Sequence, residues 1–363
     1  MRIKKTYVCR NVQDFGIMMD IPLHLKVRAG DVGIFEVLHI GKHSRVQDDS
    51  KRNVMILEGD YIMAAFGTRY ATAQIEGYLP EHLDQELHIL GAGGTVGVVK
   101  SIHIQFQEVG PTKLKLVGLA KSDDGQIINT KKIEENRITP FNPVNTNPGK
   151  VILSLGSSMD SGKTTSAAYL VHGLKSAGMN VAYIKLTGTI YTKDADLAFD
   201  LGADISRDFG DFGFPSTYMC EEEELLDLYE SLLEEVRPAK PDYIIMEIAD
   251  GLFQRETRIL LTQSELMARI DGVMFSAGDS LSAVHGVELL KAWGVTPNCI
   301  SGLFTTSPLL IEEVKQNTNI PVYNIQELSL AEVATGIFER KTRRIKKLSN
   351  GHATLHSLTA SAK

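Results

Sequence analysis

Two rhythms of apolar and polar residues divide the chain. In its first part, short segments alternate apolar and polar side chains between glycine-rich turns; in 101–109 (SIHIQFQEV), Ile102, Ile104 and Phe106 alternate with polar residues. A period of two predicts strands with one buried face. The same pattern predicts strands over 31–40, 59–67, 71–79 and 113–120. Because long amphipathic helices are missing, we predict a small all-β domain, a barrel or a sandwich, over residues 1–138.

From residue 150 on, continuous apolar runs alternate with segments of helical periodicity. The apolar runs predict strands over 150–156, 180–186, 242–248, 271–277, 298–304 and 320–325. The intervening segments predict helices, among them a first helix that ends near Gly178 and later ones over 222–236 and 282–294. Strands that are apolar throughout are typical of a parallel sheet with helices on both faces. We therefore predict a doubly wound, mostly parallel α/β domain over residues 150–339.

The composition of residues 139–150 (TPFNPVNTNPGK) is that of a linker, with three prolines, three asparagines and no periodic apolar pattern. We predict a linker over 139–149. After residue 339 the chain becomes basic and then polar, and the cations are Arg340, Lys341, Arg343, Arg344, Lys346 and Lys347. This tail, residues 340–363, is either a solvated helix end with a disordered terminus or an electrostatic contact for a nucleic acid or an acidic protein.

A glycine-rich loop follows the first strand of the second part. The stretch LSLGSSMDSGKTTSAAYL begins at Leu153, and five residues separate Gly156 from Gly162, one more than in the usual phosphate-binding loop. The loop leaves an apolar strand and opens an amphipathic helix, where backbone N–H groups and the helix dipole converge on an anion. We predict a P-loop nucleotide site formed by Gly156, Ser158, Met159, Asp160, Ser161, Gly162, Lys163, Thr164 and Thr165.

The residue types of this loop predict separate tasks. Lys163 is placed to reach the β- and γ-phosphate oxygens, Thr164 to give its hydroxyl to Mg²⁺, and Thr165 to touch the α-phosphate. Asp160 either binds Mg²⁺ or a substrate amine, or points to solvent. The loop therefore predicts that the protein uses a nucleotide together with Mg²⁺.

The sequence is less informative about the base of the nucleotide. The N-K-x-D motif of many GTP-specific proteins is absent, and only Thr305 and Thr306 stand where a base-reading loop would lie. We therefore expect ATP rather than GTP.

Charged residues follow two of the predicted strands, at the sheet edge where ligands bind in open α/β folds. Glu247 ends the strand 242–248 and is expected to complete the magnesium shell or to position a nucleophile. Lys185 ends the strand 180–186 and either stabilises a substrate carboxylate or phosphate, or faces solvent. Asp194 and Asp196 lie in the following segment. The predicted catalytic residues are Lys163, Lys185 and Glu247, and the predicted metal ligands are Thr164, Asp194, Asp196 and Glu247.

The order of these motifs resembles the dethiobiotin synthetase family, whose loop has the form G-T-x-T-x-V-G-K-T with the same spacing. That family continues with a strand ending in K-P-V and a glycine, an Asp in a loop, and E-G-x-G after a later strand; Lys185, Gly188, Asp194 or Asp196, and Glu247 match these positions. The resemblance covers residues 150–330 and implies ATP-dependent activation of a small carboxylate or carbamate in a homodimer. Leu186 and Thr187 replace the Pro-Val pair, so we do not extend the resemblance to the biotin substrate.

Two other patterns predict no binding site. The glycine run 91–97 (GAGGTVG) precedes an apolar strand instead of a helix, and we expect a β-turn there. His39 and His43 lie at a strand end and in a polar loop without further ligands, so a metal site is not expected.

Composition narrows the setting. The chain has 363 residues, 43% of them apolar and 23% charged, as in ordinary globular proteins. The net charge of −7 argues against a surface built throughout for nucleic acid or anionic membrane. Its three cysteines form no C-x-x-C pair, no apolar run is long enough to span a bilayer, and the first residues lack a signal-peptide pattern. We expect a cytoplasmic protein with no membrane contact.

Three functions are compatible with these patterns. The leading one is an ATP- and Mg²⁺-dependent, ligase-like enzyme that acts on a small molecule. The second is a nucleotide-driven switch or assembly ATPase whose β domain or basic tail holds a macromolecule. The third is a nucleotide-binding structural subunit without turnover.

Overall fold

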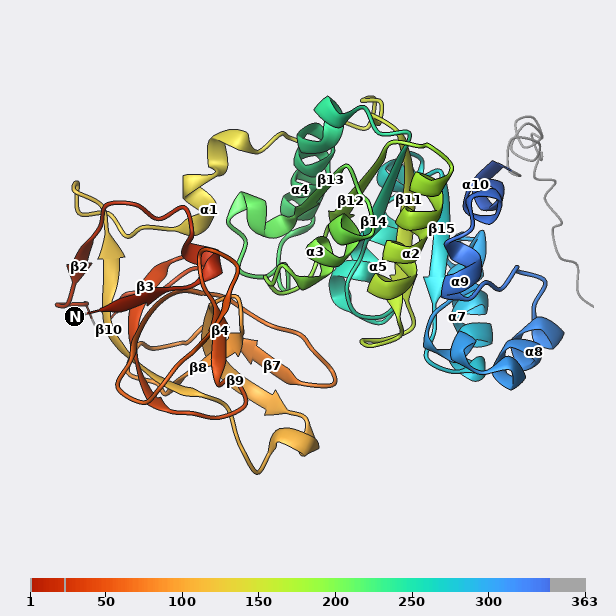
Figure 1. Ribbon diagram of the computed structural model, residues 1–363. Coiled ribbons are helices and arrows are strands. Elements are labelled where there is room, and N and C mark those ends of the chain that lie inside the picture. Colours follow the sequence, from red (N-terminus) through yellow and green to blue (C-terminus); the bar gives the residue numbers. More distant parts are fainter. Residues whose placement is uncertain (1, 23, 340–363) are drawn as a thin grey trace, which may run out of the picture.

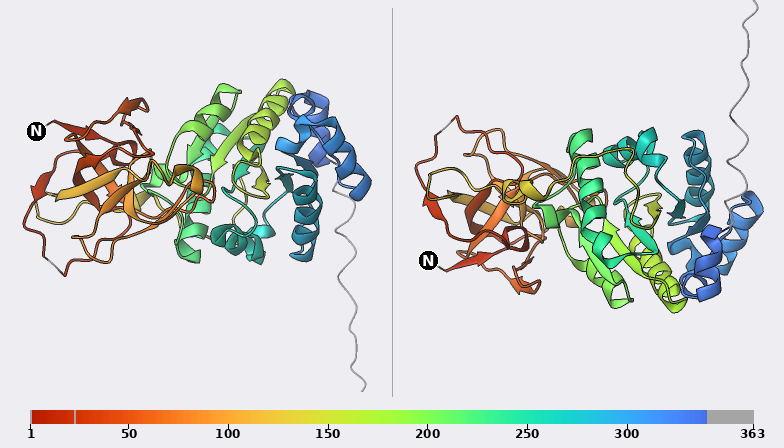
Figure 2. Two further views of the ribbon diagram at one scale, coloured as in Figure 1. Left: turned by 90° about the horizontal axis from the view of Figure 1, so that it is seen from below. Right: turned by 90° about the horizontal axis from the view of Figure 1, so that it is seen from above.

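The computed structural model describes residues 2–22 and 24–339. An all-β part at one end of the molecule is followed by an α/β part, and helices near the end of the described chain lie farthest from the β part (Figures 1 and 2). The predicted basic tail, residues 340–363, lies outside the described residues.

The β part contains a closed barrel. Strands β3, β6, β8, β9 and β10 pair in a circuit, in the order β6-β3-β10-β8-β9 and back to β6. Within this circuit of described strands, the closing β6–β9 pair is parallel and the other four pairs are antiparallel. Short strands extend the circuit, with β1 beside β6, β2 beside β10 and β7 beside β9, while β4 and β5 pair separately. The bounds are β1 (Ile3–Lys5), β2 (Gly16–Met18), β3 (Val32–His39), β4 (Arg45–Gln47), β5 (Asn53–Met55), β6 (Tyr61–Phe66), β7 (Ile75–Tyr78), β8 (Leu87–Gly91), β9 (Thr95–Ile102) and β10 (Lys113–Lys121).

Strand β6 buries both of its faces. Ile62, Ala64 and Phe66 point into the barrel, where the Phe66 ring lies 5.3 Å from that of Phe35 in an edge-to-face arrangement. The alternate residues Met63 and Ala65 belong to a different apolar cluster, which continues into the α/β part. The outer wall of the barrel is therefore an interface as well as a surface.

The prediction of one strand over 101–109 is wrong. Strand β9 ends at Ile102, where its pairing with β7 also ends, and residues Ile104–Phe106 form a 3-10 helix. The side chain of His103 accepts a hydrogen bond from Gln105 N at the start of this helix, and Ile104 is 76% exposed. Alternation predicts a strand only where a neighbouring strand completes the hydrogen bonds, and here the chain has left the sheet.

The α/β part is built on six parallel strands in the order β13-β12-β14-β11-β15-β16. Their bounds are β11 (Lys150–Gly156), β12 (Val181–Lys185), β13 (Ile205–Asp208), β14 (Tyr243–Glu247), β15 (Gly272–Ser276) and β16 (Cys299–Ser301). The predicted strand over 320–325 is wrong, because only one bridge, Ile300 to Val322, forms there. Strand β13, whose sequence ISRD is half charged, was not predicted from apolar runs.

Helices cover both faces of this sheet, as the apolar strands predict. Helices α2 (Lys163–Ser176), α3 (Lys193–Asp200), α9 (Ile325–Leu328) and α10 (Ala331–Glu339) pack on one side. Helices α4 (Glu222–Val236), α5 (Arg255–Thr262) and α7 (Ser280–Ala292) lie on the other, with α6 (Ser264–Met267) beside α5 and α8 (Pro308–Asn317) beside α7. Successive residues of β11 alternate between the two apolar clusters, Ile152 in one and Leu153 in the other. The doubly wound fold is confirmed.

Among the described helices, none has both the length and the apolar character that a bilayer crossing requires. The short helix α1 (Thr130–Ile133) and an irregular stretch lead from the barrel to β11.

One continuous apolar core joins the barrel to the sheet. Val32 and Ile34 from the outer side of β3 share a buried cluster with Phe209 and Phe212, which follow β13. The backbones also approach closely, since a Cβ on Gly93 would lie 2.1 Å from the carbonyl oxygen of Ile190. The two parts thus share one buried apolar core.

Hydrogen bonds across this interface add direction to the packing. Thr95 Oγ1 donates to the carbonyl of Pro215 at 2.9 Å, and Gln47 Nε2 donates to Thr192 Oγ1 at 2.8 Å. All of the contacted α/β residues come from the long segment between β12 and α4. This segment positions the barrel over the carboxyl edge of the sheet.

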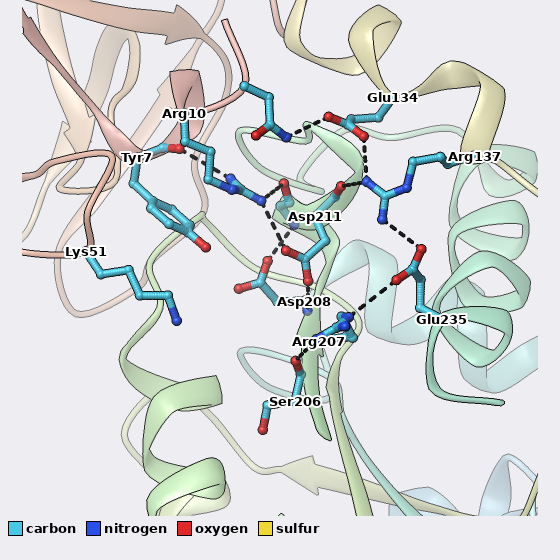
Figure 3. Close-up of polar contacts among 12 residues, drawn as sticks. Tyr7, Arg10, Lys51, Glu134, Arg137, Ser206, Arg207, Asp208, Asp211 and Glu235 are labelled. Atoms are coloured by element: carbon cyan, nitrogen blue, oxygen red, sulfur yellow. Dashed lines mark hydrogen bonds and ion pairs between the residues drawn. The ribbon is translucent and has the colours of Figure 1, made fainter. Parts of the chain in front are cut away.

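A charged cluster lies beside the same interface (Figure 3). Arg10 of the barrel donates to the carbonyl of Gly210 at 2.7 Å and to Asp211 Oδ1 at 3.1 Å, with its guanidinium 4.2 Å from the centre of the Tyr7 ring. Asp208 is buried and accepts a hydrogen bond from Gly210 N at 2.7 Å. Burial and the nearby charge of Asp211 raise the pKa of Asp208 to about 7, against the opposing charge of Arg10.

We predict that Asp208→Asn stabilises the protein at alkaline pH. An Asp whose pKa is raised in the folded state binds a proton on folding, so its stabilising contribution is present below about pH 4 and is lost as pH rises towards 7. Asparagine keeps the Oδ1 acceptor for Gly210 N but does not ionise. At pH 8 the variant should therefore unfold at a higher urea concentration than the wild type, with a free energy of unfolding larger by at least about 1 kcal/mol. At pH 5 the difference between the two proteins should be smaller. Asp123→Asn, on an exposed turn, is the control; identical pH profiles for wild type and Asp208→Asn would contradict this account.

Candidate functional site

The glycine-rich loop connects the end of β11 to the start of α2, at the carboxyl edge of the sheet. Gly162 is the N-cap of α2, with φ of 91°, and no side chain caps the helix. The first N–H groups of α2 are therefore open to a ligand. The loop is held by Ser157 N, which donates to the Ser276 carbonyl at 2.8 Å, and by its Ser161 carbonyl, which accepts from Leu303 N at 3.0 Å.

Lys163 folds back over the loop. Its Nζ donates to the carbonyl of Ser158 at 2.8 Å, and the side chain is almost completely buried. Gly156 makes this path possible, because a Cβ there would lie 2.5 Å from Lys163 Cδ. Burial lowers the pKa of Lys163, while the charges of Glu247 and Asp250 act to raise it. The ammonium thus lies among carboxylates at the place where the phosphate-binding prediction puts it.

Glu247 lies at the centre of the polar groups. Thr164 Oγ1 donates to Glu247 Oε1 at 3.0 Å, and the buried Tyr183 hydroxyl donates to Oε2 at 2.8 Å. Burial and the neighbouring Asp194 raise the pKa of Glu247, whereas Lys185 and Lys163 lower it. The structure therefore brings together Thr164 and Glu247, which were both predicted as metal ligands from distant parts of the sequence.

Lys185 is buried and does not face solvent. Its ammonium forms an ion pair with Asp194 from α3. Burial by itself would lower the pKa of Lys185, but the charges of Asp194 and Glu247 outweigh it and raise that pKa above its usual range. Lys185 is thus a fixed cation beside Glu247, held in place by a second carboxylate.

The other predicted site residues are placed differently. Asp196 does not join the group around Glu247, because it forms an ion pair with Lys51 of the barrel at 2.7 Å and accepts a hydrogen bond from Thr192. Asp160 is exposed, and its backbone is in the left-handed region with φ of 60°. Asp160 and Met159 line the cavity described below, and Ser158 is exposed on the loop.

A cavity of about 270 Å³ lies between this edge of the sheet and the barrel. The loop side is lined by Asp160, Lys163, Thr164, Lys185, Asp194, Glu247 and Asp250, and the barrel side by Arg69, Tyr70, Ala71 and Gln74. The barrel residues come from the turn between β6 and β7. Sequence patterns did not predict them, because no motif marks a loop that reaches the site only through domain packing.

Asp250 was also missed, although the Asp-Gly pair after β14 is a turn signal. Its backbone has φ of 62°, and such a conformation for a non-glycine residue costs of order 1 kcal/mol and is common at functional sites. Burial raises the pKa of Asp250 to about 6, although Lys163, Lys185 and Arg69 each act to lower it. A carboxyl group with this pKa exchanges a proton near neutral pH.

A second cavity, of about 360 Å³, opens on the other side of the loop. It is lined by Gly162, Thr165, Ser166, Gly302, Leu303, Thr305, Thr306, Asn324, Ile325 and Gln326. Thr305 and Thr306, the residues predicted to stand near the base, line this cavity, and their role in base recognition stays a prediction. The two amide side chains, which were not predicted, add donors and acceptors to this wall.

The residues around the loop fit a magnesium ion bound together with phosphate. Among the described residues, no group of three or more His, Cys, Asp or Glu side chains is arranged to hold a metal by itself. Mg²⁺ is usually held by one or two protein oxygens plus phosphates and water, and Thr164 with Glu247 supplies oxygen donors of this type. Ser161 Oγ, buried in the loop, also has no hydrogen-bond partner among the described residues.

Comparison with known proteins gives distant structural matches. No family model and no curated protein matches the chain. Among solved structures, the signal recognition particle receptor FtsY from Elizabethkingia anophelis is 16% identical, with a TM-score of 0.36 over 58% of this chain and 72% of that one. A nucleotide-binding protein from Archaeoglobus fulgidus in complex with ADP is 13% identical, with a TM-score of 0.32 over 58% and 95%. The hydrogenase maturation factor HypB from Archaeoglobus fulgidus is 6% identical, with a TM-score of 0.30 over 54% and 85%.

Likeness at this level identifies neither a substrate nor a partner. None of these three proteins is described as a dethiobiotin synthetase, so that resemblance stays a prediction.

We predict that Lys185→Met lowers the free energy of unfolding by about 3 kcal/mol, since it leaves buried carboxylates without their cation. Adding Asp194→Asn should restore part of this loss, because it removes one of the unpaired charges. Lys175→Met, which breaks the more exposed pair with Asp204, is the matched control and should cost less than about 1 kcal/mol. Chemical denaturation of the wild type, Lys185→Met, Asp194→Asn, the double variant and Lys175→Met measures these differences. Strictly additive effects of the two changes at Lys185 and Asp194 would contradict the pairing.

Proposed function

We propose that the protein is an ATP- and Mg²⁺-dependent enzyme that transfers a phosphoryl group to a small molecule and so activates a carboxylate or carbamate. The observation that carries the proposal is the cavity of about 270 Å³ in which Lys163, Thr164, Lys185 and Glu247 meet the barrel. This volume suits a small molecule next to a terminal phosphate. A cavity of this size that gathers several charged side chains favours an enzyme that acts on a small molecule.

In this proposal the nucleotide lies across the start of α2. Its phosphates bind the open N–H groups of the loop and helix, and its nucleoside enters the second cavity beside Thr305 and Thr306. Lys163 exchanges the carbonyl of Ser158 for a phosphate oxygen. ATP remains the expected nucleotide, with GTP as the alternative.

Thr164 and Glu247 would hold the Mg²⁺ ion, which supplies charge neutralisation between the β- and γ-phosphates. Tyr183 keeps Glu247 oriented through its hydrogen bond to Oε2. Lys185, fixed by Asp194, presents a positive charge to the transferred group or to the acceptor. Asp250, with a pKa of about 6, is available to take a proton from an acceptor that must lose one.

A nucleotide-driven switch is the second candidate, and one observation favours it. Ala249 N donates to Thr187 Oγ1 at 2.9 Å, which links the turns after β14 and β12. The turn after β12 that contains Thr187 continues to Thr192, whose hydroxyl accepts a hydrogen bond from Gln47 of the barrel. A change at the phosphate site thus has a short route to the barrel.

Hydrolysis measurements on the purified protein separate the two candidates. ATP turnover is measured alone, with a panel of small carboxylates and amines, and with protein or nucleic-acid fractions, always beside Lys163→Ala. Stimulation by a small molecule supports the enzyme, whereas stimulation only by a macromolecule supports the switch. If the wild type binds no nucleotide and Lys163→Ala changes nothing, both candidates are excluded.

We predict that Glu247→Gln raises the Mg²⁺ concentration needed for half-maximal nucleotide hydrolysis by about ten- to a hundredfold, because a charged metal ligand is replaced by a neutral one. Asp196 lies on α3 and is paired with Lys51 of the barrel. Asp196→Asn should leave that concentration unchanged. Titration of Mg²⁺ at constant nucleotide measures both. Equal shifts in the two variants would contradict the assignment of the metal to Thr164 and Glu247.

A further inference from the structure

The barrel contributes one cation, Arg69, to the wall of the cavity between the domains. Arg69 lies in the turn after β6, where its backbone N–H and carbonyl both pair with Gly77 at 2.9 Å. This pairing fixes the turn and aims residues 69–74 at the loop side. The wall is therefore built into the barrel and does not depend on a mobile segment.

Arg69 and Lys42 are held by neutral groups. Arg69 donates to the carbonyl of Leu90 and, at 2.8 Å, to Gln74 Oε1. Lys42 Nζ donates to the same Gln74 oxygen at 2.7 Å, and its ammonium lies 4.8 Å from the centre of the Phe106 ring. Gln74 thereby draws two cations together, and of these two Arg69 lines the cavity, whereas Lys42 reaches it only through Gln74.

No carboxylate balances these two charges at contact distance. Within the described part of the chain, neither Arg69 nor Lys42 forms an ion pair. The Nε of Arg69, which is buried from solvent, also has no hydrogen-bond partner there. Both side chains are partly buried, and a partly buried cation without a counter-ion is stabilised when a ligand supplies the opposite charge.

The electrostatics of both side chains reflect this imbalance. Burial and the charge of Arg69 lower the pKa of Lys42 to about 8. Burial lowers the pKa of Arg69 to about 10, and only the charge of Asp250 opposes that change. The negative charge of a bound anion would raise both pKa values and so stabilise the charged forms of Lys42 and Arg69.

The carboxylates of the cavity are committed to the opposite wall. Asp194 is paired with Lys185, and Glu247 accepts from Thr164 and Tyr183. The positive charges of Lys163 and Arg69 both act to lower the pKa of Asp250. The exposed Asp160 belongs to the loop. The cavity is thus acidic where a metal and phosphates would bind and basic where the barrel faces them.

We propose that Arg69, supported by Lys42 and Gln74, binds the carboxylate group of the small-molecule substrate and turns its reactive end towards Lys163. This inference rests on the proposed function and deepens it, since it identifies the substrate as a small organic acid and the barrel as the part that selects it. Nη2 of Arg69 has a second N–H beyond the one given to Gln74, and a substrate carboxylate can accept a charge-assisted hydrogen bond from it, which a neutral amide replaces only weakly. The cavity of about 270 Å³ must also admit the terminal phosphate beside Lys163 and Thr164, so the acid is a small one.

The test measures binding of a series of small anions by calorimetry. The probes are malonate, succinate, glutarate and inorganic phosphate, with succinamide as the neutral analogue, each added to the nucleotide-free protein and to the protein with Mg²⁺ and a non-hydrolysable ATP analogue. We expect at least one carboxylate to bind, succinamide not to bind, and Arg69→Gln to weaken carboxylate binding by about ten- to a hundredfold. Arg45→Gln makes the same change on an exposed site of β4 and should leave binding unchanged.

A second variant separates a loss of binding from a loss of folding. Lys42 is only partly buried, and Lys42→Gln should weaken carboxylate binding about threefold or more while the protein keeps its wild-type circular dichroism spectrum. The affinity of each variant for the ATP analogue is measured separately and should stay within about twofold of wild type, since the proposed nucleotide contacts lie on the loop side.

The outcomes distinguish this proposal from the proposed function. The subsite is overturned if no carboxylate binds wild type in either state, if Arg69→Gln binds carboxylates as wild type does, if only inorganic phosphate binds, or if Arg69→Gln weakens the ATP analogue as much as the acid. If carboxylates bind through Arg69 but no nucleotide binds, the subsite stands and the proposed phosphoryl transfer fails.

Discussion

The apolar contact between the outer wall of the barrel and the segment after β13 is the constraint on which the site depends. Val32 and Ile34 on one side and Phe209 and Phe212 on the other belong to one buried cluster, so the barrel has a single seating on the sheet. That seating brings the turn containing Arg69 opposite the glycine-rich loop. Without it the loop would open directly to solvent, and a cavity with two chemically different walls would not exist.

Within this frame, the polar groups of the loop side satisfy one another. Lys163 donates a hydrogen bond to a loop carbonyl and Thr164 donates one to Glu247, while Lys185 forms an ion pair with Asp194. Each contact uses an atom that a phosphate or a metal would otherwise engage, so these internal partners hold the side chains near their working positions. On the barrel side the cations have no such carboxylate partner, and this difference between the walls indicates where an anionic ligand is still needed.

Sequence patterns predicted the sheet part well because local and tertiary requirements agree there. The helix over 222–236 was predicted to the residue, and Lys185 and Glu247 were placed correctly at neighbouring strand ends. Prediction failed where pairing partners decide the outcome: the alternating segment 101–109 leaves the sheet, and the apolar segment 320–325 forms a single bridge. Arg69 and Asp250 could not be predicted as neighbours, because only the packing of the barrel brings their charges together.

Strand β6 belongs to two interiors at once, with Ile62 inside the barrel and Met63 in the core shared with the sheet. A barrel cut off at the linker would expose the second set of apolar residues, and it would be expected to associate with itself or with chaperones. The barrel and the sheet therefore depend on one shared core, although their patterns differ along the chain. A fusion or transplant of the barrel onto another protein would have to carry a matching apolar surface with it.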